Sequence, residues 1–325
     1  MSESVLSLRD LRVTYSTSGG GVPAVRGVDL DVGKGEVVGL AGESGCGKST
    51  IAGAILRLLP DRTKIEGQAL LGDEDILTMR LGRLRAVRWQ EASIIFQGAM
   101  HGLNPVQTVG HQVAEAILTH NPGEAAAKKR VAELFEQVGL TERRIKDYPH
   151  ELSGGQKQRV MIAMALALDP QIIIADEPTT ALDVMVQAQV LRLLKRLQAE
   201  LGMSMIFITH DLSVLVEVCD RIAVMYAGKL VEIGPAEQVF DNPLHPYTKA
   251  LANAFPDIGD SAFRKRPVGL GGDPPDPQYM PSGCPFHPRC PAAIEACASE
   301  SPQLVRIGAA PRQAACLLLN EETSQ

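Results

Sequence analysis

Several features that would place this chain in a membrane, outside the cell or on nucleic acid are missing from its sequence. No apolar run reaches the roughly 18 to 20 residues that a membrane-spanning helix needs. The first residues, MSESVLSLRD, lack the charged and then apolar pattern of a secretory signal. An excess of basic residues is missing too, because 32 Lys and Arg stand against 38 Asp and Glu, a net charge of −6. We therefore expect a cytoplasmic protein for which nucleic acid is a poor partner.

Cysteine is also scarce, with six residues in a chain of 325. Thiols stay reduced in the cytoplasm, so cysteines that cluster there indicate a metal site rather than disulfides. With 45% hydrophobic residues the chain is long enough to bury a large core, and its length suggests about two domains.

The hydrophobic pattern alternates between strand-like and helix-like segments. Residues 5–15 and 24–32 carry alternating apolar positions around a glycine-rich turn and predict an N-terminal antiparallel β layer. Further predicted strands are 37–41, 92–96, 172–176 and 204–209, with a hairpin over 222–234, and predicted helices are 51–59, most of 106–168, and 185–201. Strands that alternate with helices predict an α/β fold with a mostly parallel sheet.

Two regions depart from this alternation. The helical stretch at about 98–168 predicts an inserted helical subdomain, and the Pro-, Gly- and Asp-rich composition from Pro256 to Gly283 predicts a linker. We therefore expect a main domain over residues 1–255, followed over 256–325 by the linker and a small Cys-containing C-terminal module.

Residues 42–50, GESGCGKST, fit the pattern G-x-x-x-x-G-K-[ST] between a predicted strand and a predicted helix, the context that marks a phosphate-binding loop. The glycines let backbone N–H groups curl round the phosphates of ATP. Lys48 would supply a charge for the β- and γ-phosphates, and the Ser49 hydroxyl would bind Mg²⁺. The sequence therefore predicts a P-loop NTPase core. Its expected nucleotide-binding positions are Gly42, Ser44, Gly45, Gly47, Lys48, Ser49 and Thr50.

Two adjacent carboxylates lie at the end of the predicted strand IIIAD, residues 172–176. Asp176 lies where a P-loop enzyme needs a second metal ligand, at the carboxyl end of a buried strand. Glu177 comes next, and adjacent residues at a strand end point in different directions. We predict that Asp176 faces Mg²⁺ and that Glu177 is the general base for the attacking water. A lone acidic residue in a loop would be read as solvated, but this pair closes a four-residue apolar strand.

The string LSGGQ at 152–156, whose Ser153 lies 23 residues before Asp176, makes the chain resemble the ABC ATPase family over residues 5–255. A helix that starts at Ser153 would direct its N–H groups at an anion. In this family that anion is the γ-phosphate of ATP held by the opposite subunit, so the resemblance implies a site shared between two chains. The signature positions are Ser153, Gly154, Gly155 and Gln156.

The resemblance implies roles for four more residues. Tyr15 resembles the aromatic residue that stacks on adenine, although a tyrosine at a strand end is often only packing. Gln97 resembles the glutamine that senses Mg²⁺ and water and couples to the membrane subunits. Asp183 resembles the residue that communicates across the dimer. His210 resembles the histidine that contacts the γ-phosphate, and it would otherwise be read as a surface residue.

Three longer stretches narrow the resemblance to the ATP-binding proteins of dipeptide, oligopeptide and nickel importers: ADEPTTALDVMVQAQVL, NPLHPYTKALANAFP and CPFHPRCP. This subfamily implies a heterodimer with a second ABC ATPase, two transmembrane permeases and a secreted or lipid-anchored solute-binding protein. It also implies a peripheral location on the cytoplasmic side of the membrane. After Gln97 the chain reads GAMHGLNP, which departs from the subfamily where the ATPase would meet its permease.

Four cysteines cluster near the C-terminus: Cys284, Cys290, Cys297 and Cys316. Their Pro-rich module has almost no apolar core of its own, so a metal centre would supply its order. Zinc is the usual metal for four cysteines, but the paired short spacings of zinc sites are absent, and His287 is a further candidate ligand. The subfamily resemblance implies a [4Fe–4S] cluster held by cysteines alone.

Two other functions stay open from the sequence. One is a soluble ABC-type ATPase of nucleic-acid maintenance or translation, although such proteins tend to carry two cassettes, a long coiled-coil insertion or a basic face. The other is a redox or metal sensor in which the cysteine module is primary and the ATPase accessory.

Overall fold

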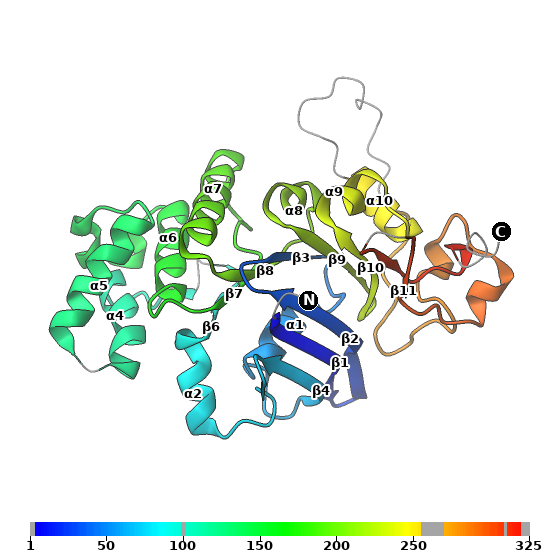
Figure 1. Cartoon of the computed structure of the whole chain (residues 1–325), viewed down its shortest axis with the longest axis horizontal. Coiled ribbons are helices and arrows are strands. Elements are labelled where there is room, and N and C mark those ends of the chain that lie inside the picture. The colour runs from blue at the N-terminus through cyan, green and yellow to red at the C-terminus, as the bar shows by residue number, and fades with distance from the viewer. Residues whose placement is uncertain (1–3, 99–101, 122, 255–269, 309–310, 320–325) are drawn as a thin grey trace. The chain divides into compact units, whose positions relative to one another are not determined.

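The structure, a computed structural model, describes residues 4–98, 102–121, 123–254, 270–308 and 311–319 (Figure 1). The chain divides into two compact units. Unit 1 comprises Met1–Leu6, Val32–Glu36 and Leu71–Ile208, and unit 2 comprises Ser7–Asp31, Val37–Leu70 and Thr209–Gln325.

The N-terminal segment forms the β layer that its alternating pattern predicts. Strands β1 (Ser4–Thr17) and β2 (Gly20–Gly33) are joined by a short turn and are therefore antiparallel, and β4 (Lys64–Leu71) lies on the other side of β1. The buried side chains of β1 shift phase at Asp10, whose φ of 43° marks an irregularity in the strand. Both strands are longer than the sequence predicts.

Unit 2 also contains β3, which leads into the phosphate loop, and the strands of the C-terminal segment. Strand β3 (Val37–Ala41) pairs in parallel with β9 (Arg221–Tyr226), and β10 (Lys229–Pro235) pairs antiparallel with β9 through the predicted turn. Two short strands continue the sheet beyond β10: β12 (Gln313–Ala314) pairs antiparallel with β10, and β11 (Val305–Arg306) pairs antiparallel with β12. The helices of this unit are α1 (Lys48–Ile55), α8 (Leu212–Val218), α9 (Ala236–Asp241) and α10 (Pro246–Ala254), and its 3₁₀ turns are His287–Arg289, Glu295–Ala298 and Leu317–Leu319.

Helix α1 differs from its predicted range of 51–59 at both ends. It begins within the loop because Gly47, with φ of 107°, turns the backbone into the helix at Lys48. It ends early because Arg57 adopts a left-handed φ of 51°. The N–H groups of Arg57 and Leu58 then reach back to the carbonyls of Ala54 and Gly53, which closes the helix as glycine commonly does.

Unit 1 contains a parallel sheet of β6 (Ala92–Ile95), β7 (Ile172–Asp176) and β8 (Ser204–Ile208). Every residue of β7 and β8 is buried, which explains their continuous apolar runs. Strand β5 (Glu74–Asp75) is short, and the helices are α2 (Leu81–Gln90), α4 (Val109–His120), α5 (Glu124–Gln137), α6 (Gly154–Ala165) and α7 (Val184–Leu201), with 3₁₀ turns at Glu142–Lys146 and Pro149–Glu151. The predicted α/β class is confirmed.

Within unit 1, helices α4, α5 and α6 contact one another (Figure 1). Helix α7 begins next to the predicted Asp183 and ends at Gly202, whose φ of 62° stops it as the sequence predicts. Among the helices of the described ranges, none is long and apolar enough to cross a lipid bilayer. Residues 255–269, which include the first part of the predicted linker, lie outside the described residues.

A buried polar cluster joins β10 to the C-terminal segment. The Glu232 side chain is fully buried and pairs with Arg312, the distance from Nη2 to Oε1 being 2.7 Å. Glu232 also accepts hydrogen bonds from the backbone N–H groups of Leu244 and His245. His245 is 2% exposed, its Nδ1 accepts from the N–H of Tyr247, and burial lowers its pKa to about 4. His245 is therefore neutral at neutral pH.

We expect this histidine to make the fold acid-sensitive. Its folded pKa lies below the unfolded value of about 6.5, so the unfolded chain binds more protons between these values, and stability falls as pH falls through this range. The His245 contribution to the free energy of unfolding should drop by about 1 kcal/mol between about pH 7.5 and 5.5, and by about 3 kcal/mol once the pH is well below 4.

Urea unfolding of the wild type and of His245→Asn across this pH range measures the effect. Asparagine keeps an acceptor for the Tyr247 N–H but does not titrate, so the variant should lose this part of the pH dependence. An identical dependence in both proteins would contradict the assignment.

Candidate functional site

The predicted phosphate loop lies in unit 2 between β3 and α1, and its backbone conformation requires glycine. Gly42, Gly45 and Gly47 have φ values of 149°, 81° and 107°. A Cβ at Gly42 would lie 2.3 Å from the Met225 carbonyl oxygen, and one at Gly47 would lie 2.4 Å from that of Ala24. Larger residues would therefore displace the loop.

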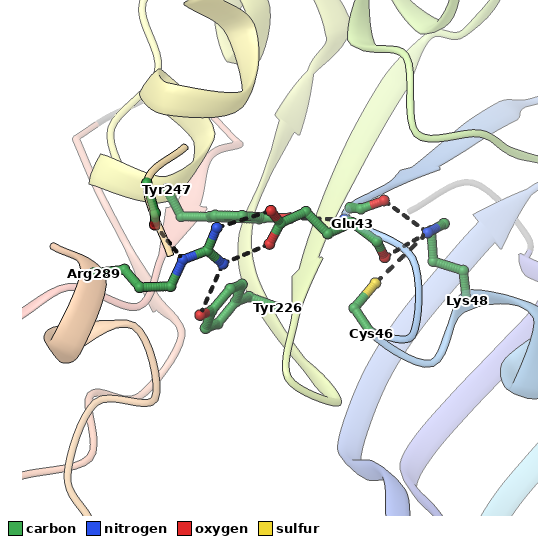
Figure 2. Close-up of polar contacts among 8 residues, drawn as sticks. Glu43, Cys46, Lys48, Tyr226, Tyr247 and Arg289 are labelled. Atoms are coloured by element: carbon green, nitrogen blue, oxygen red, sulfur yellow. Dashed lines mark hydrogen bonds and ion pairs between the residues drawn. The ribbon is translucent and has the colours of Figure 1, made fainter. Parts of the chain in front are cut away.

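Lys48 is 5% exposed, and its charge is held against the loop. Its Nζ donates to the carbonyl oxygens of Gly42 and Glu43, at 2.7 and 2.9 Å (Figure 2). The Sγ of the buried Cys46 lies 3.7 Å from the same nitrogen, and burial raises the pKa of this thiol. An ammonium fixed by loop carbonyls lies where a triphosphate cradled by the loop needs a positive charge.

The other predicted nucleotide contacts of unit 2 flank the loop. Ser49 is exposed at the start of α1, and the half-buried Tyr15 is joined to this helix by a 3.1 Å hydrogen bond between its hydroxyl and that of Thr50. His210 is exposed and follows β8. Its neighbour Asp211 accepts a hydrogen bond from the Ser213 N–H and caps α8.

In unit 1 the structure brings two of the predicted catalytic residues together. Asp176 ends β7 and is 6% exposed. Glu177 follows it in a left-handed conformation with φ of 45°, and its N–H donates to the Ile208 carbonyl on β8. The Glu177 Oε2 accepts from the Gln97 Nε2 at 2.9 Å and from the Thr180 hydroxyl at 2.7 Å.

This geometry has consequences for the chemistry. A positive φ at a non-glycine residue is strained, and such conformations cluster at functional sites. Two hydrogen bonds fix the Glu177 carboxylate. Because Glu177 is only half-buried, this carboxylate remains accessible to water. Thr180 was not among the predicted residues, and its place three residues after Glu177 is the only signal of this contact in the sequence.

The signature segment caps helix α6. The Ser153 hydroxyl accepts from the Gln156 N–H at 3.4 Å, and the Gln156 Oε1 accepts from the Ser153 N–H at 3.0 Å. A Cβ on Gly155 would lie 2.5 Å from Val186, so Gly155 allows α6 to approach α7 closely. Asp183 caps α7 by accepting from the Val186 N–H at 3.0 Å. Ser153 and Asp183 thus have structural roles that sequence reasoning missed.

All four clustered cysteines lie among the described residues, and none of them forms a disulfide. Cys284, Cys297 and Cys316 are buried, and Cys290 is half-buried. Burial raises the pKa of the Cys284 thiol. The Cys284 N–H donates to the Cys297 carbonyl at 2.9 Å, so these two cysteines are neighbours. In the ranges that the structure describes, no three His, Cys, Asp or Glu side chains form a group able to hold a metal ion, so the predicted metal centre has no support from coordination geometry.

Comparison with known proteins decides the family. The family model described as ABC transporter matches residues 25–180, and the model described as oligopeptide/dipeptide transporter, C-terminal region, matches residues 231–297. The dipeptide transport ATP-binding protein DppD of Bacillus subtilis is 46% identical over 300 residues, which span 91% of this chain and 89% of the relative. This chain belongs to the ABC transporter family.

Within the ABC transporter family, the oligopeptide transport ATP-binding protein OppD of Escherichia coli is 44% identical over 304 residues, which span 93% of this chain and 90% of OppD. Among solved structures, the post-hydrolysis dimer of the ATP-binding cassette MJ0796 bound to ADP and Pi is 31% identical, with a TM-score of 0.64. The match spans 71% of this chain and 98% of the MJ0796 chain. The predicted family and its dipeptide and oligopeptide branch are confirmed.

The family makes the chain an ATPase, for which ATP and Mg²⁺ are the expected ligands. The alternative of a nucleic-acid maintenance or translation ATPase is not favoured, because these relatives are named as transport proteins. The C-terminal family match includes Cys284, Cys290 and Cys297 but ends before Cys316.

Proposed function

We propose that this chain is the ATP-binding and ATP-hydrolysing subunit of an importer of dipeptides or oligopeptides. The observation that carries the proposal is the hydrogen bond between Gln97 and Glu177, which joins the predicted water-sensing amide to the predicted base. These residues follow adjacent parallel strands, in a chain 46% identical to a dipeptide transport ATP-binding protein.

In this proposal the phosphate loop binds ATP. The loop N–H groups and Lys48 bind the β- and γ-phosphates, and Tyr15 stacks on adenine. Ser49, Asp176 and Gln97 would hold Mg²⁺, whose charge, once bound, offsets that of the phosphates. The donor set fits the ion, because hydroxyl, carboxylate and amide oxygens are hard ligands.

Hydrolysis is an in-line attack of water on the γ-phosphorus, with ADP as the leaving group. Glu177 accepts a proton from the water, and Gln97 positions the water next to the Glu177 carboxylate. His210 contacts the γ-phosphate. The strained backbone and the bond to Thr180 fix the Glu177 carboxylate before ATP arrives, which lowers the entropic cost of reaching the reactive arrangement.

We infer that the complete site needs two chains, in which the signature residues Ser153 to Gln156 of each chain close the P-loop of the other. Asp183 communicates across this dimer. The start of α6 supports this, because its first turn presents N–H groups and the positive end of a helix dipole. The partner is a second, related ABC ATPase, and the pair lies beneath two permeases on the cytoplasmic side of the membrane. A secreted or lipid-anchored protein would deliver the peptide.

The permeases are proposed to dock near Gln97 to Asn104. Large apolar side chains are exposed at both ends of this segment, Phe96 at 47% and Val106 at 79%, as expected where another protein binds. The buried Gln112 holds the segment by bonding both backbone groups of Asn104. Residues 99–101, where the sequence departs from the subfamily, lie outside the described residues.

Transport by the purified complex tests the proposed function. Proteoliposomes that contain this chain and the proteins that copurify with it should import a labelled dipeptide or oligopeptide with MgATP. They should not import it with a non-hydrolysable ATP analogue. Import that proceeds equally with the analogue, or failure to import any peptide while another solute is imported, would overturn it. Two copies of this chain without a second ATPase would overturn the heterodimer.

We also propose that residues 256–325 form a linker and a module whose Cys284, Cys290, Cys297 and Cys316 hold a [4Fe–4S] cluster. The support is the burial of three thiols and the 2.9 Å hydrogen bond from the Cys284 N–H to the Cys297 carbonyl, which makes these two cysteines neighbours. The His287 Nδ1 contacts the Cys284 carbonyl oxygen at 2.9 Å, and ligation by cysteines alone rests on the subfamily resemblance. When bound, the cluster would tie distant parts of the module together through Fe–S bonds.

Protein purified without oxygen should therefore be brown and contain iron and acid-labile sulfide, and Cys290→Ser should lose both while the variant still binds ATP. Elemental analysis and the visible spectrum measure this. The matched control is Cys219→Ser, at a buried cysteine outside the module. Colourless protein with stoichiometric zinc would replace the cluster with a zinc site, and metal-free protein with four free thiols would reject both.

A further inference from the structure

An arginine of the cysteine module reaches the phosphate loop. The guanidinium of Arg289 forms a bidentate ion pair with the Glu43 carboxylate, with Nη1 at 2.7 Å and Nη2 at 2.9 Å from its two oxygens (Figure 2). Glu43 is the second residue of the loop, and 246 positions separate it from Arg289. The Arg289 side chain is 7% exposed and that of Glu43 is 22% exposed, so the pair is largely shielded from solvent.

Glu43 is held by its backbone as well. Its N–H donates to the Tyr247 hydroxyl at 2.8 Å, and its carbonyl oxygen accepts from the Lys48 ammonium. The Tyr226 ring lies beneath the guanidinium, 5.9 Å from its central carbon to the ring centroid. One residue thus connects Arg289 to the lysine that the proposed function assigns to the phosphates.

The segment that carries Arg289 is itself anchored. Phe286 is 1% exposed and packs edge-on against Tyr226 and Tyr247, with ring centroids 5.2 and 5.4 Å apart. Between Cys284 and Cys290 the backbone closes two successive turns, in which the N–H of His287 donates to the Cys284 carbonyl and that of Arg289 to the Phe286 carbonyl. The Arg289 Nε donates to the Gly271 carbonyl, so the guanidinium also holds part of the predicted linker.

The charges explain why the contact matters for a phosphate loop. A carboxylate in a loop that binds a triphosphate repels the ligand unless a cation neutralises it. Arg289 supplies that cation in a planar, two-point geometry that lysine cannot reproduce. A cavity of about 410 Å³ beside the loop is lined by Glu43, Ser44 and residues 274–277 of the same C-terminal segment, which confirms that this segment borders the loop.

We propose that Arg289 is a positioning residue for ATP: by neutralising and fixing Glu43, it sets the affinity of the phosphate loop for the nucleotide, so that the cysteine module and the ATP site are coupled. This inference rests on the proposed function of the loop as an ATP site.

Binding of a fluorescent ATP analogue to the full chain tests it. Arg289→Ala should raise the Kd about fivefold or more, a typical size for coupling between sites. Arg289→Lys should show a smaller rise, because it keeps the charge. Glu43→Gln should raise the Kd less than Arg289→Ala does, because it leaves no unpaired carboxylate. Adding Arg289→Ala to Glu43→Gln should raise the Kd little further, since the carboxylate that Arg289 pairs with is already gone.

Arg312→Lys is the matched control, because Arg312 ties the same C-terminal segment to Glu232 on β10. It should lower the melting temperature while ATP affinity stays within about twofold. In the assembled transporter, Arg289→Ala should raise the KM for ATP and leave kcat at saturating ATP within about twofold, which a general loss of structure would not do.

The outcomes separate the inference from the function on which it rests. A wild-type chain that fails to bind ATP would remove the proposed function. A wild-type chain that binds ATP, with an Arg289→Ala variant that is folded and equally tight, would overturn only the inference. Equal losses in Arg289→Ala and Arg312→Lys, or additive losses from Arg289→Ala and Glu43→Gln, would also overturn it.

Discussion

Replacing Glu177 by glutamine is expected to stop ATP hydrolysis by the assembled transporter while ATP binding stays intact. The amide oxygen can still accept the hydrogen bonds from Gln97 and Thr180, so the local structure is kept. The amide cannot accept the proton of the attacking water, and loss of a general base costs about 10² to 10⁴ in rate. The variant should therefore accumulate as an ATP-closed dimer.

Phosphate release under saturating ATP measures the rate, and gel filtration with ATP detects the closed dimer. Glu142→Gln is a suitable control, because Glu142 is an exposed acid of the same unit. Near-normal turnover of Glu177→Gln would remove Glu177 as the base.

Replacing Lys48 by alanine is expected to weaken ATP binding itself. Hydrogen bonds to charged groups contribute about 1.5 to 3 kcal/mol each, so the Kd for ATP should rise roughly 10- to 150-fold. The side chain also bonds the carbonyl oxygens of Gly42 and Glu43, so its loss further loosens the loop.

Equilibrium binding by calorimetry measures this loss, with Lys34→Ala as a control at an exposed lysine. The melting temperature without nucleotide shows whether the variant is folded. Unchanged ATP affinity in a folded Lys48→Ala protein would contradict the role given to this residue.

Much of the fold follows from short-range patterns in the sequence. The fully buried strands β3 and β7 occupy their predicted ranges because a continuous apolar run bounded by glycine or charge has few alternatives in a parallel sheet. The end of α7 at Gly202 and the turn at Ala227 and Gly228 also follow from local backbone preferences.

Other features depend on contacts that no local pattern reveals. Helix α1 ends just before Arg57, which adopts the conformation usual for glycine, so no stop signal is visible in the sequence before Pro60. Gly155 is recognisable in the sequence as part of a motif. The reason that glycine is needed there, the close contact of this position with Val186, is visible only once α6 and α7 are packed together. The Arg289 pair with Glu43 joins residues 246 positions apart, and either charge alone reads as a solvated side chain.

The site is predictable to a similar extent. The pattern of the phosphate loop and the acidic pair after β7 identify the chemistry, because each residue type is needed at that spacing. The hydrogen bond between Gln97 and Glu177 depends on the pairing of β6 with β7, which follows from tertiary structure.

The coupling of ATP hydrolysis to transport is tested most directly by measuring peptide import and ATP hydrolysis in proteoliposomes that contain wild-type, Glu177→Asp or Glu177→Gln subunits, with a wild-type partner ATPase in each. We predict that the two rates fall together across the series and that Glu177→Gln supports neither at more than a small fraction of the wild-type rate. Peptide import at the wild-type rate by transporters whose Glu177→Gln subunit no longer hydrolyses ATP would contradict this coupling.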